Sequence, residues 1–202
     1  MKAKKTTKKD VIRAFILDKS EELFIRNGFE QTSMDMIARA CDLSKPTLYK
    51  YFSCKHDLLT GVHVRLYELI NDAILEHLKK DKDRLAVLEE IVDSTVRTVA
   101  EHRDFLSLFS HEYHHLTHED FSGPIAWSLT NRKTMSRVFT RFLDGIVRAE
   151  VKKRFGVESL ASIILNMFDT LFFDLAVNES DRVATFKELL FYILKNSVLR
   201  PQ

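Results

Sequence analysis

The sequence predicts an all-helical fold, and two observations lead to that prediction. The 202 residues include only five glycines and three prolines, so residues that interrupt helices are sparse. Apolar residues recur at helical rather than alternating spacing, and the 45% hydrophobic content is enough for a sizeable core. We therefore expect about nine helices, divided between an N-terminal three-helix domain over residues 1–58 and a larger helical domain over residues 59–202.

The first helix is expected from near Thr7 to Asn27. Thr7 is followed three residues later by Asp10, which is the spacing of an N-terminal capping box. Gly28 is suited to end the helix, because glycine adopts positive φ without strain. Four residues at helical spacing then form the face that packs against the helix-turn-helix: Ile16, Ser20, Leu23 and Phe24.

Two short helices separated by a three-residue turn are predicted between residues 32 and 52, and together they form a helix-turn-helix motif. Thr32 or Ser33 can cap the first helix, and Thr32 with Asp35 has the spacing of a capping box. The turn is residues 41–43, where Asp42 tolerates a left-handed conformation. Ser44 is placed to cap the second helix.

The second helix has an exposed face that suits a DNA groove. Only Leu48 and Phe52 are apolar at a four-residue spacing, which leaves basic, hydroxyl and aromatic groups facing out. Such groups bond phosphates and base edges, although a solvated helix face is the alternative. The predicted DNA-binding residues are Thr32, Ser33, Ser44, Lys45, Pro46, Thr47, Tyr49, Lys50, Tyr51 and Lys55.

These residues carry a resemblance to a known family. The runs ILDKSEELFIRNGFEQTS and DMIARACDLSKPTLYKYFSCKHDLL resemble the DNA-binding domain of the TetR (tetracycline-repressor) family of bacterial transcription regulators. Two positions depart from the usual pattern: Asp42 stands where glycine is usual, and Cys54 stands at the cap before the fourth helix, with Ser53 as a nearby substitute. The resemblance implies a homodimer that binds a palindromic operator in double-stranded DNA and responds to a small-molecule effector, most often as a repressor.

The division of charge agrees with DNA binding at the N-terminal end. Residues 1–60 hold 12 Lys/Arg against 8 Asp/Glu, whereas the whole chain has a net charge of only +2. A basic arm over residues 1–9 can add phosphate contacts or serve as a solubilising tail. No secretory signal or membrane-spanning run is found, and we interpret Cys41 and Cys54 as packing or capping residues, so a cytoplasmic bacterial location is expected.

The remaining helices are expected in this order. A long helix begins at Lys55 and ends near Leu78, and residues 85–102 and 103–116 form two more. Ser122–Gly123–Pro124 is the clearest break, after which a helix extends to about Arg154 and stops at Gly156. Two strongly apolar helices, about residues 157–177 and 181–199, complete the chain.

The last two helices are apolar around most of their circumference, so each must be buried on more than one side. They form either the centre of a monomeric core or, as we favour, an intrachain face and a dimer interface. A two-fold dimer is also what a palindromic site requires. The predicted interface residues are Ile163, Met167, Leu171, Phe186, Leu190 and Leu194.

Aromatic residues lie on the helices that surround an effector pocket in this family. Aromatic stripes are more often plain core, but as a group they favour an apolar or aromatic effector. The predicted pocket residues are Phe105, Phe109, Tyr113, Trp127, Phe139, Phe168 and Phe172.

The histidine-rich segment offers an alternative. His111, Glu112 and His115 match H-E-x-x-H, in which two histidines hold zinc and the glutamate activates water. Five of the eight histidines lie between His102 and His118, so a chance match is easy, and we prefer exposed or helix-terminal histidines. The weak metal candidates are His111, His115 and His118.

The prediction is therefore a dimeric, ligand-responsive DNA-binding regulator that is not an enzyme and needs no cofactor. Two alternatives are a constitutive architectural DNA-binding protein of the same family and, more remotely, a metal-dependent hydrolase.

Overall fold

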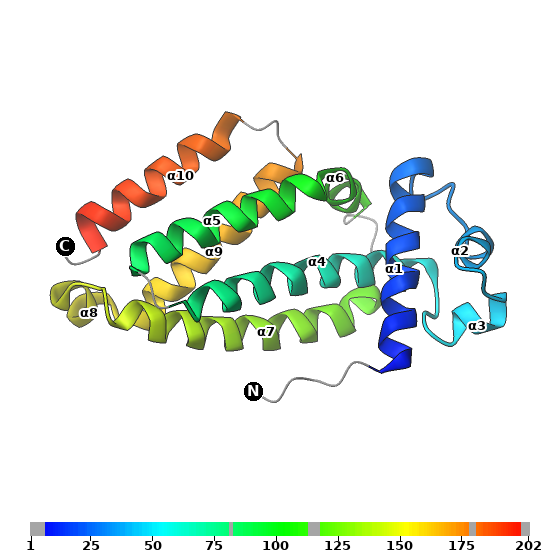
Figure 1. The fold of residues 1–202 in the computed structure, drawn as a ribbon, viewed down its shortest axis with the longest axis horizontal. Helices are drawn as coiled ribbons and strands as arrows, with labels where there is room; N and C mark the ends of the chain where they lie inside the picture. The colour runs from blue at the N-terminus through cyan, green and yellow to red at the C-terminus, as the bar shows by residue number, and fades with distance from the viewer. Residues whose placement is uncertain (1–6, 81–82, 113–117, 178–180, 199–202) are drawn as a thin grey trace. The chain divides into compact units, whose positions relative to one another are not determined.

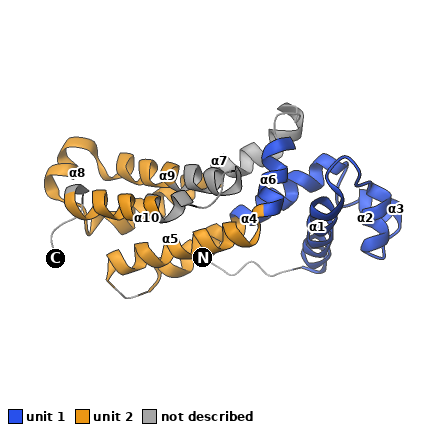
Figure 2. Cartoon of the chain, turned by 90° about the horizontal axis from the view of Figure 1, so that it is seen from above, with its two compact units in different colours: residues 1–67, 104–125 blue, residues 68–103, 126–202 orange. Residues whose placement is uncertain are grey.

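The structure is a computed structural model in which residues 7–80, 83–112, 118–177 and 181–198 are described (Figure 1). Side chains at 118–130, 168–177, 181–184, 186, 197 and 198 lie outside that description. Ten α-helices and a short π-helical turn, Leu194–Val198, occupy the described ranges, which contain no strand. The all-helical prediction is confirmed. By their contacts the residues form two compact units: residues 1–67 with 104–125, and residues 68–103 with 126–202 (Figure 2). The predicted functional boundary after residue 58 stays a prediction.

The first unit is built on α1 (Lys8–Asn27), and both ends of this helix are as predicted. Thr7 accepts a hydrogen bond from the Asp10 amide, and the Asp10 carboxylate accepts one from the Thr7 amide, so the capping box is complete. Gly28 ends the helix with φ of 80°, a conformation that side chains rarely adopt. Ile16, Ser20 and Phe24 are fully buried.

The helix-turn-helix consists of α2 (Met34–Ala40) and α3 (Lys45–Tyr49), followed by α4 (Lys55–Leu78). Ile37, Leu48 and Phe52 are at most 2% exposed, so the motif is held by its apolar faces. Asp42 has φ of 54°, as predicted for the turn. Ser33 caps α2, and the predicted capping box of Thr32 with Asp35 is wrong.

Thr32 has another function because its side chain is buried. Its hydroxyl donates to the carbonyl oxygens of Gly28, at 2.8 Å, and Leu23, at 3.2 Å. Leu23 lies near the end of α1, and Gly28 is the residue that ends that helix. Thr32 therefore fastens the start of the helix-turn-helix to α1.

α4 packs closely on α1 through Gly61. A Cβ atom there would lie 2.9 Å from Leu17 Cδ2 and 3.2 Å from a ring carbon of Phe52. Arg13 reinforces this contact, since its guanidinium lies over the Phe52 ring and donates to the Tyr51 carbonyl at 3.1 Å. Arg65 donates to the Ala14 carbonyl and so adds a second link between α4 and α1.

α6 (Arg103–Glu112) also belongs almost entirely to the first unit and stacks on α4. The rings of Phe109 and His63 are parallel within 6°, with their centroids 3.8 Å apart. Tyr67 contacts the same imidazole edge-on, and His63 Nδ1 is shielded from solvent. This burial lowers the pKa of His63 from its ordinary 6.5 to about 3, because charging the ring would desolvate an imidazolium.

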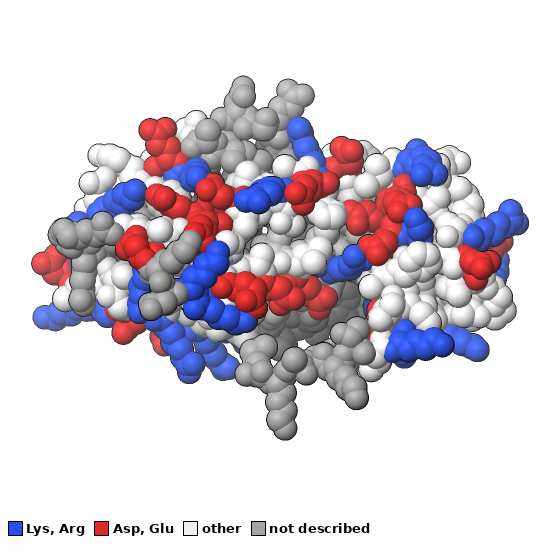
Figure 3. Space-filling model, in the orientation of Figure 1, with Lys and Arg blue, Asp and Glu red and all other residues white. Residues whose placement is uncertain are grey.

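The second unit contains α5 (Arg84–Glu101), α9 (Val157–Val177) and α10 (Asp181–Ile193). Val87, Ile91 and Val99 lie on the buried face of α5. Two ion pairs connect α10 and its terminal turn to α5: Lys187 with Asp93 at 2.5 Å, and Lys195 with Glu89 at 3.3 Å. On the face drawn in Figure 3, acidic and basic side chains are interspersed.

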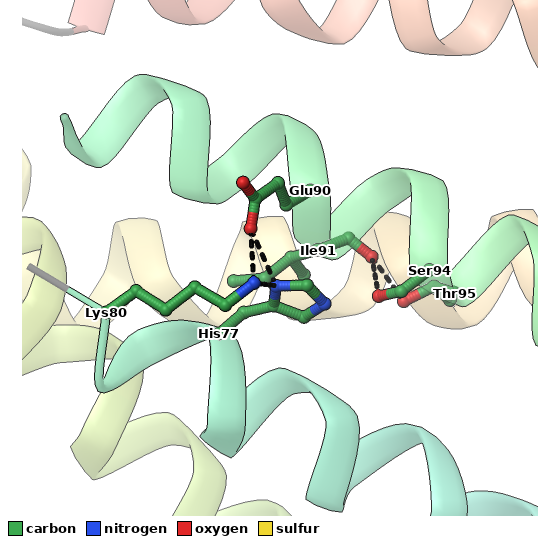
Figure 4. Close-up of polar contacts among 6 residues, drawn as sticks. All are labelled: His77, Lys80, Glu90, Ile91, Ser94 and Thr95. Atoms are coloured by element: carbon green, nitrogen blue, oxygen red, sulfur yellow. Dashed lines mark hydrogen bonds and ion pairs between the residues drawn. The ribbon is translucent and has the colours of Figure 1, made fainter. Parts of the chain in front are cut away.

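The end of α4 is joined to α5 by a polar cluster within this unit (Figure 4). Glu90 accepts a hydrogen bond from Lys80 at 2.6 Å, and His77 Nδ1 lies 3.0 Å from the same Glu90 oxygen. Beside them Ser94 and Thr95 both donate to the Ile91 carbonyl, which is ordinary hydroxyl bonding within a helix.

The helix predicted to begin at Pro124 differs from the observed helix at both ends. α7 (His118–Asp144) begins before Ser122–Gly123–Pro124 and includes it. Proline φ is compatible with a helix, so this 27-residue helix includes Pro124 despite one lost backbone hydrogen bond and the crowding that a proline ring imposes on the carbonyl four residues earlier. The predicted break there is wrong.

The same helix stops earlier than Arg154, and α8 (Ala149–Phe155) is separate. The Phe142 carbonyl accepts from Arg84, whose guanidinium lies against Gly145. The Ile146 amide donates to Leu143 instead, and Val147 is fully buried. A distant arginine thus takes the carbonyl that a continuing helix needs. α8 ends at Gly156, with φ of 74°, as predicted.

His63 should make stability depend on pH. Its folded pKa is depressed, so the unfolded chain binds the extra proton, and stability present above pH 6.5 is lost progressively as pH falls toward 3. We expect a loss of about 1 kcal/mol between pH 7.5 and 5.5, measured by urea unfolding. His63→Phe should flatten this dependence, whereas replacement of the exposed His111 by Gln should preserve it. Equal pH dependence in all three proteins would contradict the assignment.

Candidate DNA-binding surface

The turn of the helix-turn-helix is closed by backbone hydrogen bonds. The Cys41 amide donates to Ile37, that of Asp42 to Arg39 and that of Leu43 to Ala38, at 2.9–3.1 Å. Ser44 then caps α3, since its hydroxyl oxygen accepts from the Thr47 amide at 3.3 Å. These bonds fix the direction in which α3 leaves α2.

α3 buries one residue and exposes most of the others. Leu48 is fully buried, whereas Tyr49 is 43% exposed. Thr47 is half-buried, and its hydroxyl lies 2.7 Å from that of Ser44. The predicted DNA-binding residues that are exposed are Ser33, Ser44, Lys45, Pro46, Tyr49 and Lys50. A short helix with this surface offers cationic, hydroxyl and phenolic donors to a duplex groove.

Lys45 is engaged in an ion pair that the sequence pattern did not predict. Its Nζ lies 2.8 Å from Oδ1 of Asp35, in the first turn of α2. The hydrogen bond that Lys45 donates to Asp35, together with the charge of that carboxylate, raises the pKa of Lys45. The pair depends on how α2 packs on α3, which the local sequence pattern does not specify.

Two predicted DNA contacts face the protein instead. Thr32 is 1% exposed and bonds to α1, so it positions the motif and does not present its hydroxyl to DNA. Lys55 donates to the carbonyls of Phe29 at 2.7 Å and Glu30 at 3.2 Å, and lies over the Phe29 ring. Both side chains thus stabilise the loop between α1 and α2. Tyr51 is half-buried, and its carbonyl accepts from Arg13.

Ser53, the predicted substitute cap before α4, contacts the start of that helix as a hydrogen-bond donor. Its amide and its hydroxyl both donate to the Asp57 carboxylate, which lies in the first turn of α4. Cys54 is half-buried and Cys41 is buried, and desolvation raises the pKa of the Cys41 thiol. A thiol with a raised pKa is a poor nucleophile at neutral pH, which agrees with a packing role.

The predicted pocket residues are distributed over both units. Phe105 and Phe109 are buried in the first unit, with ring centroids 6.2 Å apart, and Phe139 is buried in the second. The side chains of Tyr113, Trp127, Phe168 and Phe172 lie outside the described residues. The sequence analysis did not identify His63, which stacks on Phe109. The sequence shows it only as a histidine within a largely apolar stretch of α4.

The predicted interface set needs correction in two places. Leu190 and Leu194 are 2% and 3% exposed within the single chain, because that face of α10 packs inside the second unit. Ile163 is 55% exposed, as an interface residue requires, and Met167 is half-buried. Leu171 and Phe186 lie outside the described side chains. The exposed apolar residues of α10 are Leu189, Tyr192 and Ile193.

The histidine segment yields no metal site among the side chains that are described. His111 is exposed and its Nδ1 lies 3.9 Å from Glu112, but no group of three potential ligands assembles there. His115 and the side chain of His118 lie outside the described residues. In the described part of the chain, no helix is long and apolar enough to cross a membrane.

Comparison with known proteins agrees with this geometry. Residues 16–62 match the sequence model of bacterial regulatory proteins of the tetR family. The uncharacterised HTH-type transcriptional regulator YvdT of Bacillus subtilis is 23% identical over 191 residues, covering 91% of this chain and 93% of YvdT. The negative transcriptional regulator IcaR of the Staphylococcus aureus biofilm operon is 23% identical over 153 residues, covering 74% and 76% of the two chains.

Solved structures show the same fold. A TetR-family regulator from Pectobacterium atrosepticum superposes with a TM-score of 0.70 at 18% identity, covering 98% of this chain and all of the other. The fatty acid degradation regulator FadR of Bacillus halodurans gives a TM-score of 0.66 at 18% identity, with the same coverage. The helix-turn-helix thus lies inside residues that match the tetR family, and the chain shares its overall fold with solved regulators of that family.

Proposed function

We propose that this protein is a homodimeric repressor that binds a palindromic operator and is released from it by a small apolar or aromatic effector. The observation that carries the proposal is the exposed polar face of α3, held on a buried core within the family-matching residues 16–62. IcaR, a negative regulator, supports repression as the sign of control. The proposal assigns no catalytic step and no cofactor to the chain, and it places the protein in the bacterial cytoplasm.

Reading of bases is assigned to the middle of α3. Thr47 and Tyr49 carry the donors nearest the exposed centre of the helix, and Lys50 adds a positive charge at its end. A threonine can bond a base edge or contact a thymine methyl, whereas lysine neutralises phosphate. The two kinds of residue should therefore differ in how their loss affects sequence preference.

The first test uses the operator selected by the wild-type protein from a random duplex library. Thr47→Ala should relax preference at one position of each half-site, by about 1–3 kcal/mol. Lys50→Ala should weaken binding to all sequences alike and reduce the slope of log K against log salt by about one per reading helix. If wild type enriches no sequence, or if both variants bind the operator unchanged in footprinting, α3 does not read DNA.

Dimerisation is assigned to the outer faces of α9 and α10. Ile163, Leu189 and Tyr192 are 55%, 54% and 66% exposed, a large apolar area to leave in water. One reading helix contacts only a few base pairs, so two copies related by a two-fold axis are needed for useful specificity.

The second test places a charge on this face. Leu189→Glu should convert the dimer to a folded monomer and reduce operator affinity severely, because a carboxylate would be buried opposite its own symmetry mate. Light scattering after size exclusion measures the mass. Phe155→Glu is the matched control, since Phe155 is 58% exposed on α8 and should tolerate the charge. A wild-type protein that is monomeric at micromolar concentration would refute this assembly.

Effector control is assigned to the contact between α6 and α4 in the first unit. Phe109 on α6 stacks on His63 of α4, the helix that follows the DNA-reading motif directly. A ligand that repacks Phe105 and Phe109 and binds the DNA-free conformation better will shift the equilibrium by its difference in affinity. A coupling of about 1–3 kcal/mol lowers operator affinity roughly 5- to 150-fold.

The third test compares wild type with Phe109→Leu, which keeps an apolar side chain but loses the stacked ring. Operator binding is measured with and without a compound found by screening for release. Unliganded affinity should remain near wild type, while the effector concentration needed for release should change several-fold. An unchanged response would place the effector elsewhere. Failure of every compound would favour a constitutive architectural protein.

A further inference from the structure

The surface proposed to meet DNA contains an acidic residue in direct contact with one of its cations. Asp35 lies in the first turn of α2 and Lys45 is the first residue of α3, so the pair spans the two helices of the motif. Their charged atoms are 2.8 Å apart, and the side chains are 51% and 55% exposed. Among the other exposed residues predicted to bind DNA, Ser33, Ser44 and Lys50 are neutral or basic, and the turn contributes a second exposed carboxylate, Asp42.

This pair changes what Lys45 can do when a duplex approaches. A free lysine neutralises a phosphate and releases a counterion, which favours binding to any sequence. A lysine already paired with a carboxylate brings no net charge to the surface. An exposed ion pair is weak, so a phosphate can draw Lys45 away, but Asp35 then remains as an unpaired negative charge near the DNA backbone.

A carboxylate can nevertheless be accommodated at particular bases. It accepts hydrogen bonds, and in the major groove the donors are the amino groups of cytosine and adenine. Phosphates offer no donor at all. Asp35 therefore penalises contact with an arbitrary duplex more than contact with a site that presents an amino group in the right place.

We propose that Asp35 is a specificity-determining residue, which withholds Lys45 from the phosphates of arbitrary DNA and so suppresses non-operator binding. This inference rests on the proposed function, because it assumes that α3 and the start of α2 face the duplex. Its effect lies in the ratio of operator to non-operator affinity, and a residue with a merely structural role would not change that ratio.

The experiment compares wild type with Asp35→Asn, which keeps the shape of the side chain and removes its charge. The probes are a short random-sequence duplex and the operator selected by wild type, each titrated over a salt series. Asp35→Asn should bind the random duplex several-fold to about tenfold more tightly near 0.1 M salt. Its log K against log salt should steepen by about 0.9 for each reading helix that gains a phosphate contact. Operator affinity should rise less, so the specificity ratio should fall.

Two controls separate this effect from general electrostatics. Asp42→Asn removes one negative charge from the turn of the same motif, where asparagine also tolerates positive φ, and should produce a smaller gain. Adding Lys45→Ala to Asp35→Asn should abolish the gain, because Lys45 supplies the new contact. Urea unfolding verifies that all variants are folded.

The outcomes that overturn the inference are distinct. Unchanged random-duplex affinity and salt slope in Asp35→Asn refute it, as does an equal gain in Asp42→Asn or a gain that survives Lys45→Ala. An equal rise for operator and random duplex also refutes it. A wild-type protein that binds neither duplex refutes the proposed function itself, and this inference with it.

Discussion

The position of α3, the helix proposed to read DNA, depends on the close approach of α4 to α1 at Gly61. A side chain there would collide with Leu17 and Phe52, and Phe52 directly follows the motif that contains α3. The Arg13 guanidinium lies over the Phe52 ring and donates to the Tyr51 carbonyl. The end of α3 is therefore fixed by apolar contact, a cation over a ring and one charged hydrogen bond, and these three contacts act on consecutive residues. Groove recognition requires this precision, because its hydrogen bonds tolerate errors of only a few tenths of an ångström.

Local signals were sufficient to predict most of the fold. The Thr7–Asp10 box, the positive-φ positions Gly28, Asp42 and Gly156, and the Ser44 cap all act within a few residues, so the sequence contains their whole physical cause. The bounds of α1 and α4 were predicted on that basis. Apart from the predicted break at Pro124, the errors concern long-range causes. The separation of α8 from α7 depends on Arg84, which is 58 residues away from its acceptor Phe142.

The candidate site shows the same division between features with local causes, which the sequence predicted, and features with long-range causes, which it did not. Exposure of Lys45, Tyr49 and Lys50 follows from the buried positions Leu48 on α3 and Phe52 after it, and the sequence predicted it. Pairing of Lys45 with Asp35 depends on how α2 and α3 cross, and the inward bonds of Thr32 and Lys55 depend on where α1 ends. On α10 the apolar residues surround most of the helix, so periodicity could not distinguish Leu189 from Leu190. Packing within the second unit, which includes the contact of α10 with α9, decides which one is buried.

The Arg84 contact also has a consequence for how the chain is made. Arg84 leaves the ribosome well before Phe142 and Gly145, so α5 can already be formed when the end of α7 emerges. The Ile146 amide, which would bond to the Phe142 carbonyl in a continuing helix, bonds to the Leu143 carbonyl instead. With the Arg84 guanidinium present, the Phe142 carbonyl accepts a hydrogen bond as soon as the last turn of α7 forms. The corner between α7 and α8 is thus completed by a partner synthesised earlier, in the order in which translation proceeds.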